Sequence, residues 1–275
     1  MDTAVSETII SEINAKRPLV FPDAIFFDLD GTLIDSVSDL TVAIDKMLNS
    51  LHQDLPNLKN EFPLVKDIAT VAGEEKVAGW IGNGAQKLVE RALFDAVLIK
   101  ETFEGVEVDD SSVEKTFSRL YSIARSLFDR FYAQSCTNAT GLYSGAKELL
   151  NWLSEVEVPI TLITNKPASF TDQILTSLEL KPKFSVILGG DSLAKKKPDP
   201  MPLQYCLDTL QLAANNCWMV GDSKSDVAAA KAAGCISIGV SYGYNHGRPI
   251  DDETPCWRSD SLKQLHEQLL SLYSH

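Results

Sequence analysis

Two aspartates one residue apart follow an apolar run in the stretch FFDLDGTL, residues 26–33. A carboxylate in such a place can act as a nucleophile or a metal ligand, and a neighbouring carboxylate can give or take a proton. Taken alone, an aspartate after an apolar run is more often a helix cap or a turn residue. Asp28 and Asp30 become candidates for catalysis if other polar groups meet them.

Further polar segments follow short apolar runs later in the chain. Thr164 and Asn165 follow PITLI, Asp222 and Asp226 follow CWMV, and Lys197 lies in the loop KKKPDP. In an open parallel sheet, ligands bind beyond the carboxyl ends of the strands. If the apolar runs are strands of one such sheet, these side chains are expected to lie close to Asp28 and can bind a phosphate or a metal ion.

Each of these residues also has a purely structural explanation. Thr164 and Asn165 precede a Lys-Pro pair and could cap the next helix. Asp226 lies one helical turn after Asp222 and could cap a helix or pair with Lys224. No single residue distinguishes a functional site from these structural roles. The placement of several polar groups at the ends of predicted strands does favour a functional site.

The elements that must position these groups can be predicted from apolar runs. The runs are at 24–29, 159–163, 185–188, 217–220 and 235–240. Each is short, is followed by a loop and in most cases precedes an amphipathic segment. This alternation predicts an α/β fold with a doubly wound parallel sheet.

Between residues 36 and 140 the apolar residues recur at helical spacing, beginning with Leu40, Ile44 and Leu48. This segment follows the first predicted strand, so it is expected to be a helical domain inserted into the α/β domain. The predicted organisation is a polar leader at 1–22, an α/β core at 23–35 and 141–275, and a helical cap at 36–140.

Composition limits the possible partners. With 38 acidic and 25 basic residues the formal net charge is −13, which opposes direct binding to nucleic acid or to an anionic membrane. We find neither a membrane span nor a signal peptide and expect a cytoplasmic protein. The 5 cysteines are scattered, so neither a disulfide framework nor a zinc site is expected. Oligomeric state cannot be read from the sequence.

In chain order, DLDGT, LITN, the lysine before PDP, and GDSKSD resemble the four motifs of the haloacid dehalogenase-like hydrolase superfamily. The resemblance covers 22–35 and 141–275 and implies a Rossmann-like core with a cap inserted after the first motif. It implies an Mg²⁺-dependent phosphatase that works through an aspartyl-phosphate intermediate. Asp28 would be the nucleophile, and Asp30 would be the general acid and then the general base.

The same resemblance implies roles for the other motif residues. Thr164, Asn165 and Lys197 would bind the phosphoryl group. The carboxylates of Asp28 and Asp222 and the backbone carbonyl of Asp30 would hold Mg²⁺, and Asp226 would support this site without binding the ion. The expected partner is a small phosphorylated metabolite.

Within the superfamily, WIGNGAQKLVERAL, GGDSL, KPDPMPL and VSYGYNHG are similar to segments of phosphoglycolate phosphatases. This implies hydrolysis of 2-phosphoglycolate to glycolate and phosphate. In the cap, Asn83 and Gly84 are expected to begin a helix, with Asn83 as the N-cap and Gln86 three residues later. Amides at that helix start suit the carboxylate of the leaving group. A simple loop and cap is the alternative.

Other functions are compatible with the same core. The chain could be a phosphatase of a nucleotide or sugar phosphate, or a sugar phosphate mutase. A dehalogenase is disfavoured because displacing a halide needs no acid at Asp30. A non-catalytic binding or scaffold protein is disfavoured because every charged motif residue is present.

Overall fold

The structure is a computed structural model that describes residues 19–274. It divides into two compact units, which we call the core (19–35 and 142–274) and the cap (36–141). Most of the predicted leader lies outside the described residues, and residues 19–22 have no regular secondary structure.

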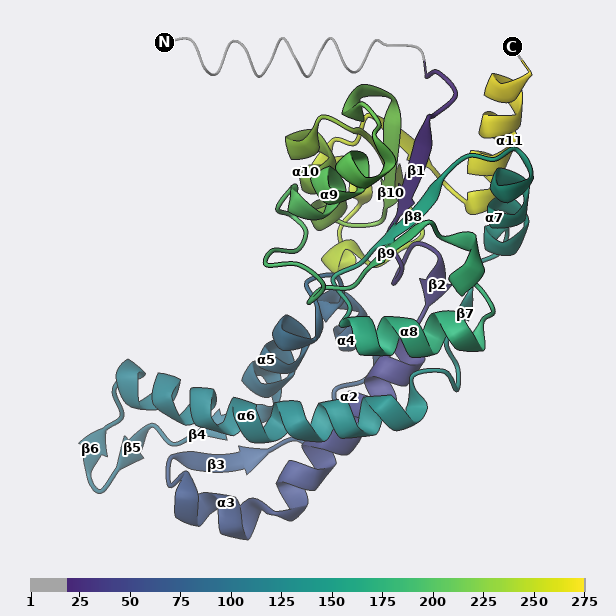
Figure 1. The fold of residues 1–275 in the computed structure, drawn as a ribbon. Coiled ribbons are helices and arrows are strands. Elements are labelled where there is room, and N and C mark those ends of the chain that lie inside the picture. The colour runs from purple at the N-terminus through teal and green to yellow at the C-terminus, as the bar shows by residue number, and fades with distance from the viewer. Residues whose placement is uncertain (1–18, 275) are drawn as a thin grey trace, which may run out of the picture. The chain divides into compact units, whose positions relative to one another are not determined.

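The core contains a six-stranded sheet with helices on its faces (Figure 1). In chain order its elements are β1 (Ala24–Phe27), β2 (Ile34–Asp35), β7 (Gly141–Leu142, at the boundary with the cap), α7 (Ala146–Glu155), β8 (Ile160–Ile163), α8 (Ala168–Ser177), η1 (Lys181–Lys183), β9 (Val186–Leu188), α9 (Met201–Leu210), η2 (Ala214–Asn216), β10 (Cys217–Gly221), α10 (Lys224–Ala233), β11 (Ile236–Val240), η3 (Asn245–Gly247), η4 (Ile250–Glu253), β12 (Trp257–Ser259) and α11 (Leu262–Tyr273).

The strand order is β12-β11-β10-β1-β8-β9, and all neighbouring strands are parallel. From β1 the sheet extends through β8 and β9 on one side and through β10, β11 and β12 on the other. The point where the order reverses is therefore next to β1, which is where ligands bind in such sheets. The predicted doubly wound α/β fold is confirmed.

The first strand is apolar along its whole length because both faces of the sheet are covered. Ala24 and Phe26 pack with Leu203 and Cys206 of α9, whereas the next residues, Ile25 and Phe27, face the other way. All four strand residues are fully buried. Figure 1 shows α9 and α10 on one side of the sheet and α7 and α11 on the other.

Five strands lie where the apolar runs predict them, and the sixth was not predicted. β12 pairs with β11 at the edge of the sheet. Its residues are Trp257, Arg258 and Ser259, of which the first two are exposed. An edge strand with so little buried surface has no apolar run to reveal it.

The cap is mostly helical, as predicted, but it also contains two antiparallel strand pairs, β3 with β4 and β5 with β6. Its elements are α2 (Val37–Gln53), α3 (Leu55–Glu61), β3 (Val65–Ile68), α4 (Glu74–Trp80), α5 (Ala85–Ala96), β4 (Val97–Ile99), β5 (Thr102–Phe103), β6 (Val106–Glu107) and α6 (Asp110–Ser135). These strands are 2 to 4 residues long, too short to interrupt a helical pattern visibly.

A buried aspartate joins the two ends of the cap. The Asp39 carboxylate, on the first turn of α2, accepts hydrogen bonds from the N–H groups of Ala139 and Thr140 at 3.0 and 2.8 Å. It also accepts one from the Thr140 hydroxyl at 2.8 Å. The bonds link positions about 100 residues apart, so they fix where the chain enters and leaves the cap.

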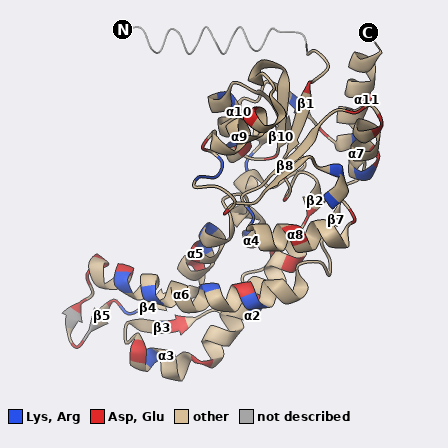
Figure 2. Ribbon diagram, viewed as in Figure 1, with Lys and Arg blue, Asp and Glu red and all other residues tan. Residues whose placement is uncertain are grey.

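Among the described residues, no helix has the length and apolar character required to cross a membrane. Acidic and basic residues occur on elements of both units (Figure 2).

Candidate active site

Three adjacent strands, β8, β1 and β10, end at the same edge of the sheet. Thr164 follows β8, Asp28 follows β1, and Asp222 follows β10. The strands are parallel and in register, so their carboxyl ends bring these three side chains to one place. The structure thus groups residues that are far apart in the sequence.

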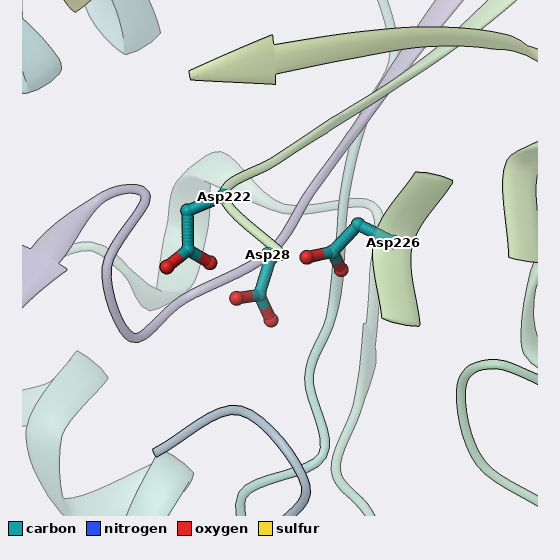
Figure 3. Close-up of side chains that lie close together, drawn as sticks. All are labelled: Asp28, Asp222 and Asp226. Carbon is teal, nitrogen blue, oxygen red and sulfur yellow. The ribbon is translucent and has the colours of Figure 1, made fainter. Parts of the chain in front are cut away.

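Three buried aspartates form a cluster at this edge. One carboxylate oxygen from each of Asp28, Asp222 and Asp226 lies within 4.8 Å of the others (Figure 3). Burial, together with the nearby carboxylates, raises the pKa of Asp28 to about 7 even though Lys197 opposes the shift. Burial and the other two carboxylates also raise the pKa of Asp222 well above its ordinary value. Added positive charge would relieve this repulsion.

Lys197 supplies part of that charge. Its Nζ donates to Asp28 Oδ1 at 2.8 Å, to Asp226 Oδ1 at 2.6 Å and to the carbonyl oxygen of Ile163. Burial lowers the pKa of Lys197, but the carboxylates of Asp226 and Asp28 outweigh burial and raise it. The neighbouring carboxylates therefore favour the ammonium form of this buried side chain. In contrast, Lys195 is exposed and pairs with Asp199.

Both carboxylate oxygens of Asp226 are occupied by protein donors. Oδ1 accepts from Lys197, and Oδ2 accepts from the Ser223 N–H at 3.0 Å and the Ser223 hydroxyl at 2.6 Å. Asp226 thus caps the start of α10 and also holds Lys197. This arrangement agrees with a supporting role in which Asp226 does not bind the ion.

Asp222 has a different environment. Its Oδ2 accepts from the Tyr244 N–H at 2.6 Å, but its buried Oδ1 has no hydrogen-bond partner among the described residues. Gly31 and Gly243 enclose the side chain so closely that a Cβ on either would lie 2.3 or 2.2 Å from an Asp222 atom. A buried carboxylate oxygen without a donor, next to Asp28, suits a hard divalent cation that prefers oxygen ligands. The residues therefore fit Mg²⁺.

Thr164 and Asn165 lie in the loop after β8, and both are buried. Asn165 Nδ2 donates to the carbonyl oxygen of Lys197 at 2.9 Å, so it links this loop to the lysine loop. Thr164 Oγ1 accepts from the Lys166 N–H at 3.2 Å and keeps a hydroxyl hydrogen that can be donated. Phosphate binding by these residues stays a prediction.

The structure adds two residues that sequence reasoning missed. Lys166 Nζ lies 2.9 and 3.1 Å from the two carboxylate oxygens of Asp30. Tyr244, in the segment VSYGYNHG, provides the N–H that holds Asp222. Lys166 directly follows the Thr-Asn pair and could have been suspected from that position. No comparable signal identifies the backbone of Tyr244.

The predicted helix cap at Asn83 is wrong. Gly84 is the N-cap of α5 and has φ 84°, a conformation that L side chains rarely adopt. Asn83 Oδ1 instead accepts from Arg91 Nη2 at 2.6 Å. Gln86 Nε2 donates to Glu90 Oε1 at 2.9 Å, one turn later in α5. A role of Asn83 and Gly84 in specificity stays a prediction.

A cavity of about 630 Å³ lies against α5 and α6 within the cap. Its apolar lining includes Leu93 and a stacked pair, Phe94 and Phe117, whose ring centroids are 4.6 Å apart. Neither Asn83 nor Gly84 lines it. The cavity therefore gives no support to the predicted specificity residues.

Comparison with known proteins agrees with this geometry. A family profile described as haloacid dehalogenase-like hydrolase matches residues 22–234. The chain is 41% identical to a phosphoglycolate phosphatase of Pseudomonas putida, over 90% of this chain and 80% of that protein. It is 40% identical to a phosphoglycolate phosphatase of Escherichia coli O157:H7, over 87% of this chain and 89% of that protein.

A solved structure is also similar. A protein described as a predicted phosphoglycolate phosphatase from Haemophilus somnus has a TM-score of 0.71 and 30% sequence identity, over 91% of this chain and 99% of that chain. The match spans both the core and the cap. Together with the site at the ends of β8, β1 and β10, these similarities show that the chain belongs to the haloacid dehalogenase-like hydrolases.

Proposed function

We propose that the protein is an Mg²⁺-dependent phosphatase that hydrolyses 2-phosphoglycolate to glycolate and phosphate in the cytoplasm. The observation that carries the proposal is the buried Asp28 carboxylate, held by Lys197 next to an Asp222 oxygen that has no hydrogen-bond donor within residues 19–274. The names of the relatives from Pseudomonas putida and Escherichia coli support the choice of substrate.

The first half-reaction uses Asp28 as the nucleophile. A carboxylate oxygen of Asp28 forms a bond to phosphorus while the bond from phosphorus to the ester oxygen breaks. Asp30 donates a proton to the departing alkoxide, which leaves as glycolate. The donors on Thr164, Asn165 and Lys197 stabilise the charge on the phosphoryl oxygens during the transfer.

The second half-reaction releases phosphate. Asp30, now a carboxylate, takes a proton from a water molecule that attacks the phosphorus of the aspartyl phosphate. The bond between phosphorus and Asp28 breaks, and the Asp28 carboxylate is restored. Asp30 regains the proton that it donated in the first step, so the cycle closes.

The carboxylates of Asp28 and Asp222 and the backbone carbonyl of Asp30 would hold Mg²⁺. When bound, the ion supplies positive charge that reduces the repulsion between a carboxylate and a phosphate dianion. The donor set supports this assignment because all three groups are oxygen ligands. Asp226 keeps Lys197 in place and does not bind the ion.

The cap residues Asn83 and Gly84 are proposed to contribute to substrate choice. Gly84 precedes the first turn of α5, whose N–H groups have no partner within the helix. Such groups attract a carboxylate, and the glycolate leaving group carries one. This proposal concerns specificity and leaves the chemistry at Asp28 unchanged.

A phosphate-release assay tests the proposal. Purified protein should hydrolyse 2-phosphoglycolate with Mg²⁺ and lose activity in excess chelator, and Asp28→Asn should remove turnover in a protein that still folds. A panel of nucleotides and sugar phosphates tests the alternative phosphatases, and product analysis of sugar phosphates tests a mutase. Full activity in chelator, or in the Asp28→Asn variant, would contradict the proposed mechanism.

A further inference from the structure

The carboxylate of Asp30 has its own buried cation. Lys166 Nζ donates to Asp30 Oδ1 at 2.9 Å and to Oδ2 at 3.1 Å. The contact is direct, and the two side chains are only 4% and 12% exposed. An ammonium that contacts both oxygens restricts the rotation of the carboxylate as well as its position.

The backbone of Lys166 is fixed on both sides. Its N–H donates to Thr164 Oγ1 at 3.2 Å, and its carbonyl oxygen accepts from the Gly190 N–H at 2.7 Å. Gly190 allows this approach because a Cβ there would lie 2.2 Å from the Asn165 carbonyl oxygen. The lysine therefore projects from an ordered loop at the end of β8.

Asp28 and Asp30, the two aspartates of the first motif, form ion pairs with different lysines. Lys197 contacts Asp28 and Asp226, whereas Lys166 contacts Asp30. Lys197 is therefore placed to act on the nucleophile and the phosphoryl group. Lys166 is placed to act on the residue that transfers protons.

We infer that Lys166 is a positioning residue for this reaction, and that it holds the Asp30 carboxylate in the orientation needed to give and take a proton. The inference rests on the proposed function, in which Asp30 acts in both half-reactions. Proton transfer requires the acid or base within hydrogen-bond reach of the reacting oxygen, so a misplaced carboxylate slows both steps. Lys166 itself is not required to touch the substrate.

A buried ion pair that only stabilises the fold would have different consequences. Loss of such a pair would lower stability and would disturb the neighbouring Thr164 and Asn165, so substrate binding and attack by Asp28 would also suffer. Loss of a positioning residue affects the steps that use Asp30. The leaving group separates these cases because p-nitrophenolate departs without help from an acid.

The test measures Lys166→Met with p-nitrophenyl phosphate and with 2-phosphoglycolate, in the presence of Mg²⁺. With enzyme in excess, release of p-nitrophenol reports attack by Asp28, and release of phosphate reports hydrolysis of the aspartyl phosphate. We expect p-nitrophenol release to change by less than about threefold and phosphate release to fall by about 10- to 100-fold. Turnover of 2-phosphoglycolate should fall by a similar factor with little change in KM.

Three variants make the test specific. Lys166→Arg should recover part of the lost activity because guanidinium can also bind both carboxylate oxygens. Lys195→Met, which removes an exposed lysine paired with Asp199, should behave as wild type. In the double variant Asp30→Asn, Lys166→Met, phosphate release should equal that of Asp30→Asn alone, because Lys166 acts only through Asp30.

The inference is overturned if p-nitrophenol release falls as much as phosphate release, or if the double variant is slower than Asp30→Asn. If Lys166→Met does not fold, the double variant, which removes both charges, and Lys166→Arg still decide the question. Lack of phosphatase activity in the wild type would instead refute the proposed function. Wild-type behaviour of Lys166→Met beside an impaired Asp30→Asn would refute only the role of Lys166.

Discussion

The cap and the core each bury an aspartate, but the two carboxylates have different partners. Asp39 in the cap accepts from two backbone N–H groups and one hydroxyl, all neutral donors. Asp222 in the core accepts from the Tyr244 N–H on one oxygen, and its other oxygen has no donor among the described residues. Asp222 also lies beside Asp28 and Asp226.

This difference is the one expected between a carboxylate with a structural role and a carboxylate that binds a metal ion, as we propose for Asp222. A buried charge is tolerated when donors from the protein compensate for lost water. The protein itself provides donors for the Asp39 carboxylate, so a structural role in the cap accounts for this residue. The buried charge of Asp222 is fully compensated only when a cation or a proton adds positive charge. The exposed fraction of the two side chains does not distinguish them, because both are buried.

The largest effect expected from this comparison is on activity in Asp222→Asn. Removal of this proposed metal ligand should lower kcat/KM at modest Mg²⁺ by about 10³-fold, because a catalytic metal ion contributes several kcal/mol. The metal-free variant should be at least as stable as wild type, since one buried negative charge is gone. Phosphate release during an Mg²⁺ titration and thermal unfolding in chelator measure the two effects. Near-normal activity would remove Asp222 from the metal site.

The pH dependence of stability offers a second test, in metal-free protein. The pKa of Asp28 is about 7 in the folded protein, against about 3.9 for an unperturbed aspartate. Between these values the unfolded chain binds fewer protons than the folded protein, so the free energy of unfolding falls as the pH rises. One proton contributes at most about 1.4 kcal/mol per pH unit.

Asp28→Asn should therefore show a shallower decline of stability than wild type between about pH 4 and about pH 7. Urea unfolding in excess chelator measures both slopes. Addition of Mg²⁺ to the wild type should reduce its decline, because the ion favours the ionised carboxylates. Identical slopes in the two proteins would mean that burial of Asp28 has no energetic consequence.

A third test concerns the cap. Asp39→Asn keeps the shape of the side chain but turns an NH₂ group toward donors at Ala139 or Thr140. We expect a loss of about 2 kcal/mol of stability, the usual scale for a hydrogen bond to a charged group. Urea unfolding monitors this loss, with Asp222→Asn as the matched control. If Asp39→Asn is no less stable than wild type, the carboxylate is not needed to close the cap.

The positions of Asp28 and Asp222 could be predicted because each residue follows a strand that is visible as an apolar run. β1 and β10 are buried on both faces, so their sequences lack polar interruptions and the aspartates after them stand out. The carboxylate arrangement of Asp28 and Asp222 then follows from the parallel register of the strands.

Other features depend on contacts that no local pattern encodes. Lys166 reaches Asp30 across 136 positions of the chain, and its Lys-Pro context resembles an ordinary helix start. The strand pairs of the cap are short, and β4 begins directly after the last residue of α5. The predicted start of α5 was wrong by one residue, because the N-cap is Gly84 and not Asn83.

The smallest expected effect concerns the start of α5. Proline has a φ near −65°, so it cannot adopt the φ of 84° at Gly84. Ala85 is the first helical residue, where proline removes one N–H and still fits the helix. If that N–H binds the leaving-group carboxylate, Ala85→Pro should lower kcat/KM for 2-phosphoglycolate by about tenfold.

Hydrolysis of p-nitrophenyl phosphate, which has no carboxylate, should stay nearly unchanged in Ala85→Pro, because the amide acts on binding and not on attack by Asp28. Ala85→Ser is the matched control, since it changes the side chain but keeps the N–H, and it should retain activity on both substrates. Circular dichroism checks that the variants are folded. If both substrates decline equally in Ala85→Pro, the turn affects the cap as a whole and the carboxylate of 2-phosphoglycolate is bound elsewhere.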